Sequence, residues 1–200
     1  PNVYRTMDGE VYGTVPKGNT PGSGFTEVQY EESIYLGYMF YETMWYEMEQ
    51  KEDGSGDAWY DEQMQYTFGY GLSYTDFAQE IAGVYSDETC TTEIGGTLTG
   101  DADTLYVKVN VTNNGKVAGK DVVQIYVNAP YYDNEIEKSY VKLVGFGKSD
   151  ILDPQETGTV VVKVNVQDMA SFDYNDANGN DSATYELDAG DYNLFAMKNS

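Results

Sequence analysis

The sequence predicts a mainly β protein, an antiparallel β-sandwich preceded by a mostly irregular, tyrosine-rich segment. Three observations support this prediction. Apolar and polar residues alternate with a period of two in several short segments after residue 76, turn-forming residues separate these segments, and the 200 residues include 20 tyrosines and 21 glycines. Such alternation buries one face of a strand and leaves the other in water, and tyrosine and glycine are typical of strands and turns respectively.

The first part of the chain is predicted to hold little regular structure. Seven glycines and prolines fall within residues 8–26, so that residues 1–26 are expected to form an extended loop. Residues 27–46 are strongly aromatic. Within them Ile34–Leu36 fits a buried strand that leads into a short helix through Tyr46, although the periodicity here does not separate helix from strand.

A strongly acidic stretch follows at residues 47–62. It carries seven acidic residues against the single Lys51, with Gly54-Ser55-Gly56 at its centre. High charge and central glycines predict a solvated, mobile loop.

The alternation after residue 76 predicts the strands of the sandwich. Shorter runs near residues 77–85, 141–147 and 169–173 bring the total to about seven strands, the number expected of a sandwich. Turn signals such as Asn113-Asn114-Gly115, Asp153-Pro154 and Asn178-Gly179 separate them. The apolar positions that alternate most clearly are Leu105, Val107, Val109 and Val111, then Val123, Ile125 and Val127, then Val160, Val162, Val164 and Val166, and finally Tyr192, Leu194 and Ala196.

The segment Leu187–Tyr192 indicates the topology. It fits a tyrosine corner, in which a tyrosine near the start of a late strand returns its hydroxyl to the backbone a few residues upstream. This feature favours an immunoglobulin-like or fibronectin type III-like sandwich.

Composition excludes several functions. Eleven basic and 34 acidic residues give a formal net charge of −23, and the chain has no histidine. Such a field repels nucleic-acid phosphates and anionic lipid. Without histidine, the chain alone cannot build a Ser-His-Asp triad, a Cys-His dyad or a histidine-ligated zinc site. The single cysteine, Cys90, cannot form a disulfide within the chain and leaves the compartment open.

Two acidic patterns invite chemical interpretations. Residues 174–181 have the composition of a calcium loop, but placing Gly179 at the turn puts Tyr174 and Tyr185 where the first and last ligands belong. A polar hairpin loop is therefore expected. Acids also lie close in sequence at Glu31 and Glu32, Asp61 and Glu62, and Asp101 and Asp103. Glycoside hydrolysis needs two carboxyl groups across a cleft, and a chain with 34 acids has such pairs by chance. We predict no catalytic residue, metal site or cofactor.

Several ordered motifs resemble one family. Glu32–Thr43 (ESIYLGYMFYET) resembles a stretch near the end of the second catalytic-region domain of family 3 glycoside hydrolases, the β-glucosidase and β-xylosidase group. Phe68–Thr75 (FGYGLSYT) resembles the motif that leads into that family's fibronectin type III-like domain. Further similar blocks are Val111–Val127 (VTNNGKVAGKDVVQIYV), Lys142–Phe146 and Ala189–Tyr192. Ser33, Met39 and Thr67 depart from the usual Gly, Arg and Pro.

The resemblance implies a domain organisation and a role. Residues 1–72 would be an extended arm and the tail of an α/β sandwich domain, and residues 73–200 the fibronectin type III-like β-sandwich. In the family, the nucleophilic aspartate and the acid/base glutamate lie upstream of the Glu32 stretch, and no segment here resembles either region. The chain is thus expected to be the non-catalytic C-terminal portion of a β-glucosidase-type enzyme, bracing its catalytic domains, while enzyme activity of the chain alone stays undecided.

An interface is expected in the aromatic stretch. Its large side chains would expose an extensive apolar patch unless something covers them, either the sandwich near Phe68, Tyr70 and Tyr74, or the catalytic domains of the parent glycosidase, or another copy of the chain. We expect the chain to self-associate through residues 1–46. The predicted interface residues are Tyr30, Tyr35, Tyr38, Phe40, Tyr41 and Trp45.

Two alternative functions remain open at this stage. A carbohydrate-binding module would stack exposed aromatic residues on sugar rings, and Tyr131, Tyr132 and Tyr140 are the candidates. An assembly subunit would exchange strands at an unpaired sheet edge. A bacterial origin fits the sequence, and both a secreted and a bacterial cytoplasmic location remain possible.

Overall fold

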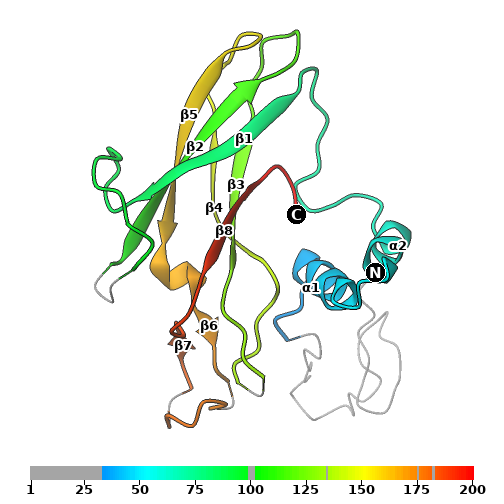
Figure 1. The fold of residues 1–200 in the computed structure, drawn as a ribbon, viewed down its shortest axis with the longest axis vertical. Helices are drawn as coiled ribbons and strands as arrows, with labels where there is room; N and C mark the ends of the chain where they lie inside the picture. Colours follow the sequence, from blue (N-terminus) through cyan, green and yellow to red (C-terminus); the bar gives the residue numbers. More distant parts are fainter. Residues whose placement is uncertain (1–32, 99–101, 134, 175, 182) are drawn as a thin grey trace, which may run out of the picture.

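The computed structural model describes residues 33–200 except 99–101, 134, 175 and 182. It shows an elongated β-sandwich with a pair of helices at one side (Figure 1). The helices and strands are α1 (Tyr38–Glu49), α2 (Ser55–Gln63), β1 (Phe77–Tyr85), β2 (Thr104–Asn113), β3 (Val122–Asn128), β4 (Lys142–Lys148), β5 (Thr157–Asn165), the 3₁₀ turn η1 (Val166–Met169), β6 (Ser171–Phe172), β7 (Tyr185–Glu186) and β8 (Asn193–Met197).

Three antiparallel sheets form in the described part of the chain. Two are three-stranded, with strand orders β1-β2-β5 and β4-β3-β8, and the third pairs β6 with β7. The first two sheets pack face to face around one apolar core. This arrangement confirms the predicted antiparallel sandwich and its mainly β class.

The predicted period-two pattern defines the core. Strand β2 alternates strictly between buried and half-buried positions, and Val107, Val109 and Val111 have no exposed surface. The register pairs Val109 with Val160 and Val107 with Val162 on β5, so their side chains share the inner face. Ile125 also lies in the core, and Leu194 packs against it at a half-buried position. Of the alternating apolar positions, Val107, Val109, Ile125, Val162 and Leu194 therefore face inward.

The tyrosine corner is present. The Tyr192 hydroxyl donates a hydrogen bond of 3.1 Å to the main-chain carbonyl of Asp188. The carboxylate of Asp188 in turn pairs with the Nζ of Lys138, a lysine with only 8% of its surface exposed. The corner thereby ties the start of β8 to the loop between β3 and β4.

The side-chain amide of Asn113, at the start of the predicted turn Asn113–Gly115, is fully buried. Asn113 Nδ2 donates to the carbonyls of Val117 (2.8 Å) and Leu152 (2.9 Å), while its Oδ1 accepts from Thr75 Oγ1 (2.6 Å) and from the Gly115 N–H (3.0 Å). Every polar group of this side chain is satisfied, which is what burial of an amide requires.

The structure corrects three local predictions. Ile34–Leu36 forms a turn and irregular chain rather than a strand, and the predicted helix extends to Glu49. The expected loop at residues 47–62 is largely helical, since α1 enters it and α2 occupies its second half. The run near residues 169–173 holds only the end of η1 and the short strand β6.

Aromatic contacts explain the unexpected helix α2. Its Trp59 packs against Tyr41 with ring centroids 6.0 Å apart, and the Trp45 indole donates to Asp57 Oδ1 at 2.9 Å. The Asp57 N–H donates to Glu49 Oε1 at 3.1 Å. Two aromatic residues among the acids therefore give this acidic segment an apolar side that packs on α1, a contact that net charge does not predict.

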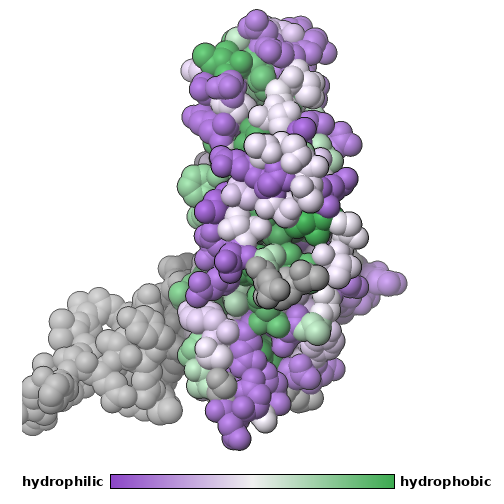
Figure 2. Space-filling view, turned by 90° about the vertical axis from the view of Figure 1, so that its left-hand side faces the viewer, coloured by the Kyte–Doolittle hydropathy of each residue, from purple (hydrophilic) through white to green (hydrophobic). Residues whose placement is uncertain are grey.

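The side of the sandwich turned away from the helices shows mixed character, with hydrophobic residues in small groups between hydrophilic ones (Figure 2). Within the described residues, neither helix has the length and apolar character needed to cross a membrane.

Candidate interface

The outer face of the β4-β3-β8 sheet is the surface on which the helical segment lies. Val123, Ile125 and Val127 of β3 point into the core, so Gln124 and Tyr126 point outward. Both are nevertheless buried, at 7% and 0% exposed surface. Their antiparallel partners on β8 are Met197 and Phe195, which share this outer face. Strand β3 is therefore buried on both sides.

Tyr38 of α1 makes the central contact on this face. Its ring stacks on Phe68 with centroids 4.8 Å apart and meets Tyr126 edge-on at 5.8 Å. Its hydroxyl accepts a 2.9 Å hydrogen bond from the main-chain N–H of Leu143 on β4. One side chain thus links α1 to two strands of the sheet and to the chain that follows α2.

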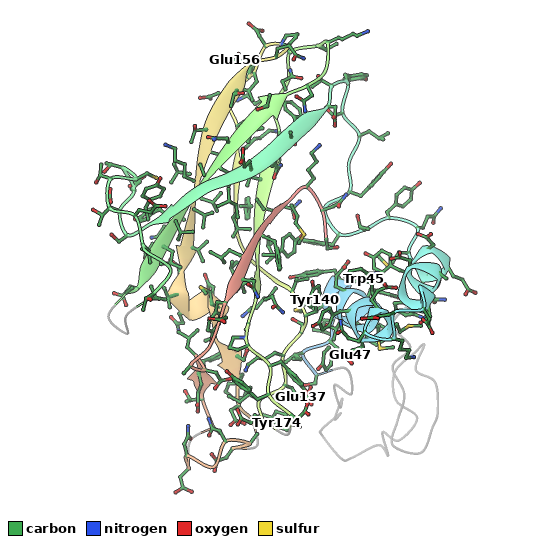
Figure 3. All side chains as sticks on the ribbon, in the orientation of Figure 1. Trp45, Glu47, Glu137, Tyr140, Glu156 and Tyr174 are labelled. Carbon is green, nitrogen blue, oxygen red and sulfur yellow. The ribbon has the colours of Figure 1, made fainter. Side chains whose placement is uncertain are left out.

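The rest of α1 continues the contact toward the β3–β4 loop. Tyr46 stacks on Tyr140 with centroids 4.2 Å apart and planes at 10°, and Trp45 lies beside the same ring at 6.1 Å (Figure 3). Thr43 Oγ1 accepts from the Tyr140 N–H at 2.9 Å. Ahead of the helix, the Tyr35 hydroxyl donates to Glu137 at 2.5 Å.

Burial changes the acidity of the phenols in this contact. It raises the pKa of Tyr38, although the hydrogen bond from Leu143 opposes the shift. Burial also raises the pKa of Tyr126 and of Tyr60, and the hydrogen bond that Tyr60 donates to the Glu42 carboxylate raises the pKa of Tyr60 further. All three phenols therefore hold their protons in the folded protein more tightly than in the unfolded chain.

A cavity of about 290 Å³ lies between the helices and the end of β8. Its described walls are mainly aromatic and apolar, and Glu42 is the one carboxylic residue among the described residues that line it. Two carboxyl groups facing a sugar-sized space are the minimum for the usual glycosidase mechanism. Glu42 is buried and accepts a hydrogen bond from the Tyr60 hydroxyl, so this carboxylate has a structural partner in the cavity wall. Its lining residues are Glu42, Trp45, Tyr60, Tyr140, Val141, Phe195, Met197 and Ser200.

The predicted interface residues are distributed as follows. Tyr38 and Trp45 pack on the sandwich, Tyr41 packs on α2, and Tyr35 bonds to the β3–β4 loop. Phe40 keeps 39% of its surface exposed. Tyr30 lies outside the described residues.

Sequence reasoning missed Tyr126 and Gln124 as the receiving surface. The signal was Tyr126 together with Val122, because apolar or aromatic residues on the second face of an otherwise alternating strand are typical of burial on both faces.

The three sugar-binding candidates do not share one free aromatic surface. Tyr140 has a ring face covered by Tyr46. The Tyr132 hydroxyl donates to the Ala189 carbonyl at 2.9 Å, and Lys138 Nζ lies 5.8 Å from its ring centroid. Tyr131 is 52% exposed.

The acidic patterns found in the sequence are only partly described by the structure. In the loop that resembled a calcium site, Asp173 accepts from the Ala177 N–H at 3.0 Å, and Glu186 accepts from the amides of Asn178 and Asn180. Asp61 and Glu62 are exposed on α2. Glu31, Glu32 and Asp101 lie outside the described residues. Across the part of the chain that the structure describes, no three acidic or cysteine side chains converge as a metal site.

The antiparallel sandwich with its tyrosine corner has the features of an immunoglobulin-like or fibronectin type III-like domain. Residues 121–200 match the family described as the fibronectin type III-like domain. The chain is 36% identical over 172 residues to β-glucosidase A of Butyrivibrio fibrisolvens, covering 84% of this chain and 18% of that protein. It is 33% identical over 195 residues to a β-glucosidase of Rhizobium radiobacter, covering 90% of this chain and 19% of that protein.

Solved structures agree with these sequence similarities. A β-glucosidase from Paenibacillus barengoltzii matches with a TM-score of 0.65 and 32% identity, covering 86% of this chain and 16% of that one. β-Glucosidase 3B from Thermotoga neapolitana matches with a TM-score of 0.58 and 32% identity, covering 86% of this chain and 19% of that one.

These comparisons confirm the predicted resemblance to the fibronectin type III-like region of β-glucosidase-type glycoside hydrolases. The relatives come from both bacteria and fungi. The chain spans less than a fifth of the length of these curated relatives.

Proposed function

We propose that this chain is the non-catalytic structural portion of a β-glucosidase-type glycoside hydrolase and that it braces the catalytic domains. The observation that carries the proposal is the extent of the similarity. A match over 84% of the chain is longer than the sandwich alone, so it includes residues on both sides of Ser73. The relatives thus share the helical segment together with the sandwich, as expected if the two act as one unit.

The contacts between the two parts support a bracing role. Tyr38 bonds to β4, stacks on Phe68 and packs on Tyr126, while Tyr46 stacks on Tyr140. A segment that leads out of an upstream domain and lies flat on the sandwich would hold the sandwich in a fixed orientation to that domain. We place the boundary between the two parts near Ser73.

A segment exchange tests the proposal. In β-glucosidase A of Butyrivibrio fibrisolvens, the part that aligns with this chain is replaced by this chain, and a second version lacks that part altogether. The exchanged enzyme is expected to hydrolyse an aryl β-glucoside and to keep its thermal stability, whereas the shortened one loses both. The 200-residue chain alone is expected to show no hydrolysis above buffer.

Two results would overturn the proposal. A shortened enzyme as active and as stable as the intact one would remove the bracing role. Hydrolysis by the chain alone, abolished by changing a single Asp or Glu, would make the chain itself an enzyme.

A further inference from the structure

The outer face of the β4-β3-β8 sheet is only half covered. Among the described residues, the helical segment covers the half around Tyr126, which is fully buried, whereas Val122 and Phe146 in the other half are exposed. Beside it runs the segment Phe68–Phe77, here called the strap. Strap and sheet together line a groove of about 1080 Å³, here called the strap groove.

The strap is fixed at both ends. At its start, the Phe68 carbonyl accepts from the Ser200 N–H at 3.0 Å, and Phe68 stacks on Tyr38. At its end, Thr75 Oγ1 donates to Asn113, and the Asp76 carbonyl accepts from the Asn114 N–H at 2.7 Å. The side chains between these anchors are therefore presented on a restrained backbone.

The apolar side chains of the strap groove are exposed to an unusual degree. Tyr74 is 98% exposed, Leu72 91% and Phe146 73%. Tyr70 and Val122 of the same groove are also exposed. Scattered apolar residues are normal on a surface, but a contiguous group of this kind marks an interaction site.

The charge of the strap groove is opposite to that of the rest of the chain. Four of the 11 basic residues line it, against two acids, Asp76 and Asp121, which makes its balance 4 − 2 = +2. The remaining residues carry 7 − 32 = −25. Lysines around an apolar centre favour a partner whose carboxylates meet them at the rim. The four are Lys116, Lys120, Lys148 and Lys198.

We infer that the strap groove is the surface that docks on the catalytic region of the glycosidase, and that the receiving patch there carries apolar side chains ringed by carboxylates. This inference rests on the proposed function and names the surface through which it acts. The groove continues the face on which the helical segment already lies, so a domain upstream of that segment is within reach of it. More than four fifths of the relatives' length lies outside the match and offers such a domain.

The experiment places groove variants in the exchanged enzyme described above. Leu72→Asp with Tyr74→Asp removes the apolar centre, and Lys116→Glu with Lys120→Glu reverses the rim. Ile151→Asp and Tyr174→Asp are matched controls, because these side chains are 64% and 62% exposed and lie outside the groove. The readouts are the temperature at which β-glucosidase activity is lost and the melting temperature of the same variants in the isolated chain.

The groove variants are expected to lower the inactivation temperature of the exchanged enzyme by roughly 5 °C or more, because they weaken the contact that holds the sandwich on the catalytic region. In the isolated chain they should leave the melting temperature unchanged, since Leu72 and Tyr74 are almost fully exposed and Lys116 and Lys120 are also exposed. Both controls should leave both temperatures unchanged.

Three outcomes would speak against the inference. If the unaltered exchanged enzyme works and the groove variants match the controls, the groove does not dock, although the proposed function stands. If the unaltered exchanged enzyme is inactive, the proposed function is wrong, and the inference that rests on it is wrong as well. If the isolated chain sediments as a dimer that Leu72→Asp with Tyr74→Asp dissociates, the occupant is a second copy and the assignment to the catalytic region is wrong.

Discussion

The ring of Tyr38 meets the ring of Tyr126 edge-on, with centroids 5.8 Å apart and planes at 87°. Tyr126 has no exposed surface although it points away from the sandwich core, and its hydroxyl donates to Gln124 at 2.8 Å. Edge-to-face pairs add about 0.5–1.5 kcal/mol beyond the area they bury. This pair therefore contributes to holding the helical segment on the sandwich.

Tyr38→Ala is expected to lower the free energy of unfolding by about 2–3 kcal/mol. The change removes the contacts with Phe68 and Tyr126 and leaves the Leu143 N–H without its acceptor. Tyr74→Ala removes an equally large ring that is 98% exposed, and should change stability by less than about 0.5 kcal/mol. Urea denaturation compares the two, and equal effects would show that the helical segment contributes nothing through Tyr38.

Asn113→Ala should be strongly destabilising, by roughly 3 kcal/mol. The carbonyls of Val117 and Leu152 lose their donors, and buried polar groups without partners are costly. The neighbouring Asn114→Ala is the control, since that side chain is exposed. Thermal melting of both variants checks the prediction. A small decrease in the melting temperature of Asn113→Ala would mean that water donates to the two carbonyls in place of the amide.

Gly69 and Gly71 are expected to respond differently to alanine. Gly69 has φ +86°, and a Cβ there would lie 2.5 Å from Gln124 Nε2, which is held by its hydrogen bond to the Lys198 carbonyl. Gly69→Ala should therefore cost roughly 1–3 kcal/mol. A Cβ on Gly71 meets nothing within 4 Å, so Gly71→Ala should be neutral or slightly stabilising. The reverse order in chemical denaturation would refute this account of the strap.

Alkaline pH is expected to weaken the contact between helices and sandwich. The pKa values of Tyr38, Tyr60 and Tyr126 are raised, chiefly by burial, above the value of about 10 that they have in the unfolded chain. Their contribution to stability is therefore complete below pH 10 and is lost as pH rises toward the folded pKa values. Urea unfolding between pH 8 and about 11 should show a falling free energy. In Tyr126→Phe the free energy of unfolding should fall less steeply with pH. The same pH dependence as in the unaltered chain would contradict the contribution assigned to Tyr126.

The core of the sandwich could be predicted because its determinants are local. Val107, Val109 and Val111 alternate with more polar residues. Because a strand has only two faces, this pattern identifies the face that is buried. The tyrosine corner at Tyr192 is likewise encoded within six residues, and its hydrogen bond to Asp188 formed as expected.

The helical segment could be predicted only in part. Aromatic residues indicated a buried stretch at Tyr38 and Trp45 and left three possible covering surfaces, of which the one near Phe68 contacts Tyr38. The acidic composition of residues 47–62 favoured a loop, whereas Trp59 and Tyr60 made much of that segment helical by packing on α1.

By itself the sequence determined the sandwich, its inward residues, the corner at Tyr192 and the resemblance to β-glucosidases, because each depends on residues close together along the chain. Only the tertiary structure decided that Tyr126 is covered by Tyr38, which lies 88 residues earlier in the sequence. It also decided that Leu72 and Tyr74 are exposed in a groove lined by four lysines. The periodicity of a strand shows which side chains point away from the core. It does not show whether those side chains are exposed to water or covered by another segment. That choice depends on contacts between distant parts of the chain, whose partners no local pattern specifies.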